Sequence, residues 1–116
     1  MISLLAKSVR ETLSSAFPNT VIKDEEYVPY KGQKLFFDFY LPALNIYVEV
    51  QGIQHTEFNS HFHSDAAAFR AQKHRDRLKV EWCSLNDYTL LRVNYDEIPI
   101  SVEDLLRKVS EAQNNG

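Results

Sequence analysis

Two short segments rich in aromatic and β-branched residues, LFFDFYL at 35–41 and NIYVEVQ at 45–51, are separated by only three residues. Such residues favour strands, and a link as short as Pro42-Ala43-Leu44 favours strands that run antiparallel. We therefore expect a β-hairpin in the middle of the chain. Any fold of this sequence must be built around the sheet that contains this hairpin.

Helical and strand patterns flank the hairpin. Residues 3–16 show apolar side chains at helical spacing, with Ser3 as the N-cap and Pro18 just after the end. A strand is expected within 20–30, and 31–33 is expected to be a turn. Residues 52–63 have no clear period. A helix is expected from Ser64 to about Asn86, with an apolar stripe made of Ala71, His74, Leu78, Trp82 and Leu85.

A strand at 88–94 and a C-terminal helix at about 101–113 complete the pattern, and Ser101 with Asp104 resembles a capping box. Residues 114–116 are expected to fray. The order α-β-β-β-α-β-α predicts an α/β fold, with a mixed sheet flanked by helices. With 116 residues the chain can form one core but not two, so we expect a single domain over 1–116.

Composition excludes several classes of function. The net charge of −3 excludes a uniformly basic nucleic-acid coat, although a local basic stripe remains compatible with it. A single cysteine excludes a disulfide framework and a four-cysteine zinc module, and it favours a reducing, cytoplasmic location. No glycine-rich phosphate loop is present. No apolar run approaches the roughly 18 residues that span a membrane, and we expect neither a signal peptide nor a membrane anchor.

The predicted hairpin carries two acidic side chains. Strand residues alternate between faces, so Tyr47, Glu49 and Gln51 should share one face, opposite Val48 and its apolar neighbours. In the preceding strand we expect 37, 39 and 41 on one face and 36, 38 and 40 on the other. If the hairpin closes with Pro42 opposite Asn45, Asp38 and Glu49 become direct cross-strand neighbours with Cβ atoms about 5 Å apart.

Two opposed carboxylates destabilise a sheet and raise each other's pKa. A hard divalent cation relieves both effects, because Mg²⁺ and Ca²⁺ prefer carboxylate oxygens. The hairpin geometry is therefore compatible with a metal site. It is equally compatible with two acids on a hydrated face, or with a turn that places them on opposite faces.

The ordered set of motifs resembles the core of PD-(D/E)XK nucleases, which have a restriction-endonuclease-like αβββαβ fold. More narrowly, it resembles the branch related to very-short-patch-repair endonucleases and phage homing endonucleases. The resemblance covers about residues 4–96, leaves the C-terminal helix as an addition, and is carried by the segments FDFYLP at 37–42, IYVEVQGIQH at 46–55, RDRLK at 75–79 and YTLLRV at 88–93.

The resemblance implies hydrolysis of DNA phosphodiester bonds with Mg²⁺ or Mn²⁺. It assigns metal binding to Asp38 and Glu49, and it gives His55 a role as general base or in charge stabilisation. Asp76 on the long helix would hold either this histidine or a second metal ion. Glu11 on the first helix matches an acid that approaches the site in many members of the class. Gln51 departs from the pattern, because the wider class usually has lysine there.

A basic run on the long predicted helix supplies further candidates. Lys79 shares a helix face with Asp76 and can replace the missing lysine, while DNA-backbone contacts are predicted for Arg70, Lys73, Arg75 and Arg77. A solvated helix face is the simpler interpretation of the same charges.

Other histidines and the cysteine have simpler interpretations. His55, His61 and His63 have a spacing that only weakly resembles a zinc site, and we expect polar loop residues instead. His74 is expected in the apolar stripe. Cys83 is interpreted as a small buried hydrophobe.

Three functions follow from these residues. The first is a metal-dependent DNA endonuclease or nickase, associated with a phage or mobile element and acting as a monomer or homodimer. The second is a DNA-binding or structure-recognising module on the same fold that cleaves poorly or not at all. The third is a protein-interaction module, which the retained acids disfavour.

Overall fold

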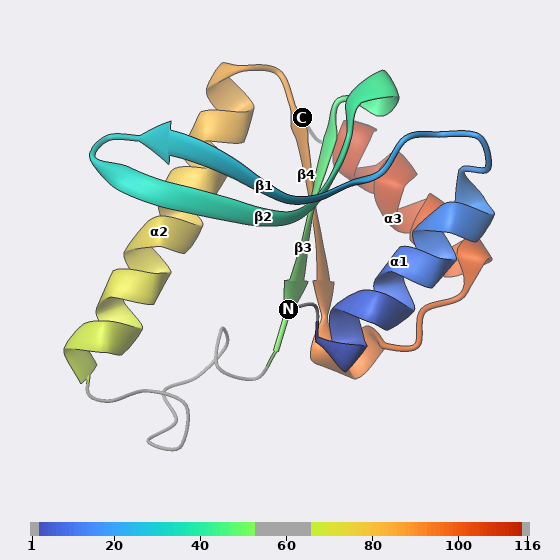
Figure 1. Cartoon of the computed structure of the whole chain (residues 1–116), viewed down its shortest axis with the longest axis horizontal. Coiled ribbons are helices and arrows are strands. Elements are labelled where there is room, and N and C mark those ends of the chain that lie inside the picture. Colours follow the sequence, from blue (N-terminus) through green and yellow to red (C-terminus); the bar gives the residue numbers. More distant parts are fainter. Residues whose placement is uncertain (1–2, 53–65, 115–116) are drawn as a thin grey trace.

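The structure is a computed structural model that describes residues 3–52 and 66–114 (Figure 1). The segments in chain order are α1 (Leu4–Ala16), β1 (Lys23–Tyr30), β2 (Gln33–Leu41), the 3-10 turn η1 (Pro42–Leu44), β3 (Ile46–Gln51), α2 (Ala66–Leu85), β4 (Thr89–Asn94), the 3-10 turn η3 (Tyr95–Glu97) and α3 (Val102–Asn114). The predicted order of elements is confirmed across these two ranges.

Within the described ranges the strands form one mixed four-stranded sheet in the order β1-β2-β3-β4. Neighbouring strands are antiparallel from β1 to β3, and β3 pairs with β4 in parallel. Figure 1 shows α2 on one face of the sheet and α1 with α3 on the other. The fold is therefore α/β, with a mixed sheet flanked by helices, as the sequence predicts.

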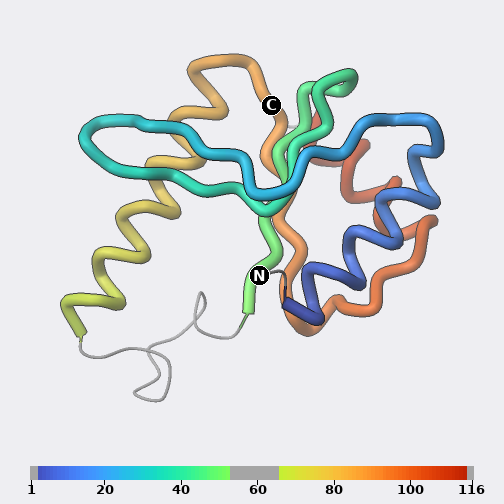
Figure 2. Tube along the Cα trace, viewed as in Figure 1, coloured from blue at the N-terminus to red at the C-terminus, as the bar shows by residue number. Residues whose placement is uncertain are grey.

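The two faces of the sheet bury separate apolar cores. The first, called here the α1/α3 core, comprises Ala6, Val9, Leu13, Phe39, Leu41, Ile46, Val48, Leu91, Val93, Ile100, Leu105 and Val109. The second, the α2 core, comprises Val28, Leu35, Phe37, Tyr47, Leu78 and Cys83. Figure 2 shows α1 and α3 side by side although they are far apart in sequence, and the hydroxyl of Thr12 donates to the Ile100 carbonyl at 2.9 Å.

Short-range signals place the ends of several elements. Ser3 caps α1, and its hydroxyl accepts a hydrogen bond from the Ala6 amide at 3.1 Å. The predicted turn after β1 is formed by Lys31 and Gly32, which both have positive φ (48° and 75°), as a tight hairpin turn requires. Within the described ranges no helix is sufficiently long and apolar to cross a membrane.

Strand β2 changes faces at Asp38, which the simple alternation did not predict. Phe37 packs in the α2 core, whereas Phe39 and Leu41 pack in the α1/α3 core, so the expectation of one common face for these three residues is wrong. On β1, Asp24 pairs with Phe39 and Glu26 with Phe37 (Cα partners), whereas Glu25 between them has φ of 52°. This irregularity in the edge strand lies opposite Asp38, and it marks where β2 turns over.

The buried face of α2 also differs from the predicted stripe. Ala71, His74 and Leu85 are exposed, so the core position predicted for His74 is wrong. The buried positions are Asp76, Leu78, Lys79 and Cys83. Two of these are charged residues, Asp76 and Lys79. Lys79 is tolerated there because Glu49 on the sheet is its partner, which no helical pattern reveals.

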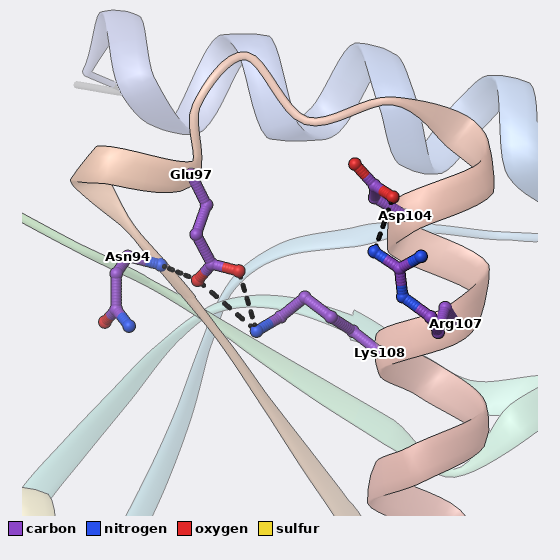
Figure 3. A network of polar contacts seen from close by, with 5 residues as sticks. All are labelled: Asn94, Glu97, Asp104, Arg107 and Lys108. Carbon is purple, nitrogen blue, oxygen red and sulfur yellow. Dashed lines mark hydrogen bonds and ion pairs between the residues drawn. The ribbon is translucent and has the colours of Figure 1, made fainter.

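The segment between β4 and α3 is held by polar contacts (Figure 3). Asn94 and Glu97 form a capping box, and the Glu97 carboxylate also pairs with the Lys108 ammonium at 3.0 Å. At the start of α3, the Ser101 hydroxyl accepts from the Asp104 amide at 3.0 Å, whereas the Asp104 carboxylate pairs with Arg107. Of the capping box predicted at Ser101, the hydrogen bond from the Asp104 amide to the Ser101 hydroxyl is therefore present.

Candidate functional site

Strand β3 directs every second side chain toward α2. Tyr47 belongs to the α2 core, Glu49 contacts α2 through Lys79, and Gln51 lines a pocket against the same helix. Val48 lies in the opposite core. The alternation predicted for β3 is confirmed, and it places a carboxylate and an amide between the sheet and a basic helix.

Glu49 and Lys79 form a buried ion pair. The Lys79 ammonium lies 3.0 Å from Glu49 Oε2, and the exposed fractions of the two side chains are 10% and 4%. The ammonium also lies 5.5 Å from the centre of the Phe37 ring, a distance compatible with a cation–π interaction. Because charges are costly to bury, such a pair is weak evidence for stability and suits a functional group held in place.

The predicted register of the hairpin is confirmed as far as the ladder extends. Phe39 pairs with Val48, and Leu41 with Ile46 (Cα partners). The ladder ends there, and Asp38 does not continue it through its backbone. Instead, Asp38 Oδ2 accepts a hydrogen bond from the Val50 amide at 2.7 Å. The carboxylate therefore accepts the hydrogen bond that a backbone carbonyl of a neighbouring strand would otherwise accept, at the point where the β2–β3 ladder ends.

The expected repulsion between the two acids is relieved by the protein itself. Lys79 compensates the charge of Glu49, and the Val50 amide hydrogen-bonds to Asp38. The charges of the two acids are thus compensated by protein groups, and a cation would be a further source of compensation. This outcome differs from the sequence argument, which considered the two carboxylates without partners from other elements.

A second contact between α2 and the sheet lies beside the first. Asp76 on α2 is 7% exposed, and its backbone carbonyl accepts from Arg92 Nη2 at 2.8 Å. Arg92 on β4 is the parallel partner of Glu49. The two contacts bring Glu49, Lys79 and Arg92 between the sheet and α2, next to the buried residue Asp76.

Arg92 was not singled out as a site residue by the sequence reasoning. In the segment YTLLRVN, Leu91 and Val93 are apolar and pack in the α1/α3 core. Alternation therefore sends Arg92 to the other face of β4. A charge within a strand buried on both faces is the signal that could have identified it.

A pocket of about 570 Å³ opens between α2 and β4, and is called here the α2 pocket. It is lined by Gln51, Lys73, Asp76, Arg77, Val80, Glu81, Ser84 and Arg92. Two of the predicted DNA-contacting residues, Lys73 and Arg77, thus meet Asp76 and Gln51 at one cavity. Arg70 is exposed and Arg75 half-buried on the same helix.

Asp38 lines a different pocket, of about 600 Å³, on the α1 side of the sheet. Lys7 and Arg10 of α1 share this pocket with Asp24 and Glu25 of β1, and Arg10 Nε donates to the Asp24 carboxylate at 3.0 Å. Asp38 therefore contributes to a pocket on the α1 face of the sheet, whereas Glu49 points to the α2 face, and the ladder does not include the predicted Asp38–Glu49 pair.

The fit of a metal ion can be tested on these donors. Carboxylates are the oxygen ligands that Mg²⁺ and Mn²⁺ prefer, so the chemistry of Asp38, Glu49 and Asp76 fits a hard cation. Across residues 3–52 and 66–114, however, no three His, Cys, Asp or Glu side chains are grouped so that they could hold one ion. Glu11 is exposed and lines neither pocket. The predicted roles of His55, His61 and His63 fall outside the described residues.

The thiol of Cys83 should be unreactive in the native protein. Burial, with a further contribution from Glu49, raises the pKa of this thiol to about 12. Because an ordinary thiol has a pKa of about 8.5 and the thiolate is the reactive form, labelling near pH 8 should be roughly a thousandfold slower than in denaturant. Cys83 is the sole cysteine, so a colorimetric thiol assay reads it directly. Equal rates in native buffer and in denaturant would contradict this assignment.

Comparisons with known proteins give relatives without an established function. The chain is 42% identical over 71 residues to uncharacterized protein 307L of Invertebrate iridescent virus 6, which covers 61% of the chain and 34% of that protein. It is 37% identical over 67 residues to uncharacterized protein 033L of Invertebrate iridescent virus 3, and this match covers 58% of the chain and 34% of that protein. The matches thus span about a third of each relative. No family model and no solved structure matches the chain.

Proposed function

We propose that this chain is a divalent-metal-dependent endonuclease or nickase that hydrolyses DNA phosphodiester bonds. The observation that carries the proposal is the burial of Glu49 against Lys79, on the strand next to Asp38. Burying ionic groups costs several kcal/mol per ion unless other contacts compensate, so a chain with no use for them gains more from apolar side chains. Support also comes from the αβββαβ order with its mixed sheet, which the resemblance to restriction-endonuclease-like cores implies.

Each of these residues would have a distinct role in hydrolysis. Asp38 and Glu49, with Asp76 as a further candidate, would hold Mg²⁺ or Mn²⁺. The bound ion would neutralise the phosphate and lower the pKa of a water molecule. Lys79 lies beside Glu49 and supplies the positive charge that lysine at position 51 would provide in the wider class. Gln51, 8% exposed at the end of β3, keeps hydrogen-bonding capacity without charge.

A specific observation favours a second candidate, a DNA-binding module that cleaves poorly or not at all. Glu49 is already paired with Lys79, and across the described ranges no three potential ligands are grouped so that they could hold one ion. Gln51 also stands at the position where the wider class usually has lysine. Both features are compatible with a module that binds DNA without cleaving it.

The biological setting is part of the proposal. Both curated relatives reported above are viral proteins, which supports an association with a virus and action on DNA within a host cell. The sequence-level expectation named a phage or mobile element, and the relatives widen this expectation to viruses of invertebrates. A homodimer would allow both strands to be cut, whereas a monomer would nick.

Incubation with supercoiled plasmid tests the proposal. The protein is incubated with Mg²⁺, with Mn²⁺ or with EDTA, and the products are resolved as supercoiled, nicked and linear forms. We expect nicking or linearisation in either metal and none in EDTA. Salt-sensitive binding without cleavage in any metal would support the second candidate instead.

A further inference from the structure

Three cationic and two acidic side chains line the α2 pocket. Lys73, Arg77 and Arg92 line it together with Asp76 and Glu81. The Glu81 carboxylate is already engaged outside this set, because it accepts from the Tyr30 hydroxyl at 2.7 Å and pairs with the Lys31 ammonium. The cavity is therefore suited to a negatively charged group.

Arg92 has hydrogen-bonding capacity that its protein contacts do not use. Its Nη2 donates to a neutral acceptor, the Asp76 carbonyl, at 2.8 Å. Its Nε is buried and has no hydrogen-bond partner among residues 3–52 and 66–114. An N–H group that is buried without an acceptor loses its hydrogen bonds to water and gains none from the protein. An acceptor bound beside it would therefore be strongly favoured.

Phosphate oxygens match this geometry. The planar guanidinium group presents its N–H donors as a fork that binds phosphate with two parallel hydrogen bonds. Arg77 is exposed and Lys73 half-buried, so both can add charge from the α2 side of the cavity. Gln51 forms part of the wall and lies two residues beyond Glu49, which places the cavity next to Glu49 of the proposed reaction centre.

We infer that the α2 pocket binds a backbone phosphate of DNA beside the bond that is cut, and that Arg92 is the residue that holds it. The inference rests on the proposed function, because it takes DNA as the partner. Arg92 acts here as a positioning residue: it fixes the strand relative to Asp38 and Glu49 without contacting the reacting atoms.

Binding measured without cleavage tests the inference. Fluorescence anisotropy of a labelled duplex is followed in EDTA over a range of salt concentrations, for the wild-type protein, Arg92→Gln, Arg92→Lys and Arg77→Gln. We expect Arg92→Gln to bind about tenfold more weakly or worse, since hydrogen bonds to charged groups contribute about 1.5–3 kcal/mol. The slope of log K against log salt should fall by about one for each lost phosphate contact. Arg92→Lys keeps the charge but not the fork, so it should retain the slope and lose affinity.

Arg107→Gln is the matched control. Arg107 is 63% exposed on α3, across the sheet from the α2 pocket, and pairs only with a neighbour on its own helix in the contacts described. It should leave affinity and slope unchanged. A thermal melt of each variant checks folding. If Arg92→Gln does not fold, the exposed Arg77→Gln still tests the pocket, with a smaller loss of affinity and the same fall in slope.

The possible outcomes separate this inference from the proposed nuclease. Plasmid cleavage by the wild-type protein with unchanged affinity and slope in both Arg92→Gln and Arg77→Gln would overturn the phosphate pocket and leave the nuclease standing. Loss of affinity in these variants without cleavage by the wild-type protein would support the pocket and overturn the nuclease. A wild-type protein that binds no DNA would overturn the pocket as a DNA contact.

Discussion

Replacing Asp38 should abolish plasmid cleavage while leaving DNA binding largely intact. If Asp38 holds the metal, its loss removes several kcal/mol of transition-state stabilisation, which corresponds to about a thousandfold or more in rate. Asp38→Asn is the sharper variant, because the amide oxygen can still accept from the Val50 amide, which now donates to Asp38 Oδ2 at 2.7 Å. The rate of nicking in Mg²⁺ and the affinity for a duplex in EDTA are measured on the same preparations.

Comparison with Asp38→Ala separates chemistry from folding. The alanine variant loses both the charge and the hydrogen bond, so it should be less stable than Asp38→Asn by about 0.5–1.5 kcal/mol, the usual net contribution of one hydrogen bond, since this one is only partly buried. Both variants should be equally inactive. Cleavage by Asp38→Asn at the wild-type rate would sink the assignment of Asp38 as a metal ligand.

Removing one member of the Glu49–Lys79 pair should be strongly destabilising. Lys79→Met leaves the Glu49 carboxylate buried without this cation, and breaking a buried pair typically costs about 3–5 kcal/mol. The double variant Glu49→Met with Lys79→Met should regain most of this loss, because apolar residues of similar volume often replace a buried ion pair at little cost. Urea denaturation monitored by circular dichroism gives the free energy of unfolding of each variant.

The exposed pair between Asp104 and Arg107 is the internal control (Figure 3). Its oxygen and nitrogen lie 2.6 Å apart, but the side chains are 51% and 63% exposed. Exposed pairs contribute about 0–1 kcal/mol, so Arg107→Ala should change the stability by no more than this amount. A loss as small as this in Lys79→Met would contradict the buried pair, and a double variant less stable than either single one would contradict the expected compensation.

Local patterns in the sequence predicted the elements that depend on near neighbours. The hairpin register followed from the short link between residues 41 and 45, and the alternation along β3 placed Glu49 and Gln51 on the face that meets α2. The cap at Ser3 and the turn at Gly32 also followed from single residues. Each of these features depends on steric and hydrogen-bonding preferences that act over a few residues.

Predictions failed where a distant segment altered the local pattern. Phe37 and Phe39 are two residues apart on β2 yet pack in different cores, because the irregularity at Glu25 on β1 interrupts the pairing between them. On α2, the helical pattern predicted burial of His74, whereas Asp76 and Lys79 are the buried residues. A helix considered alone gives no indication that Lys79 has a charged partner, Glu49, on the sheet.

By itself, the sequence determined the order of elements, the α/β class, the hairpin register and the residue types that could carry metal-assisted chemistry. Only the tertiary structure decided which of these charges meet. Lys79 reaches Glu49 across 30 positions in the chain, and Arg92 reaches the Asp76 carbonyl across 16. The physical reason is that a buried charge such as that of Lys79 is tolerated only beside its partner, and the packing of α2 on the sheet, rather than any local preference, brings these groups together.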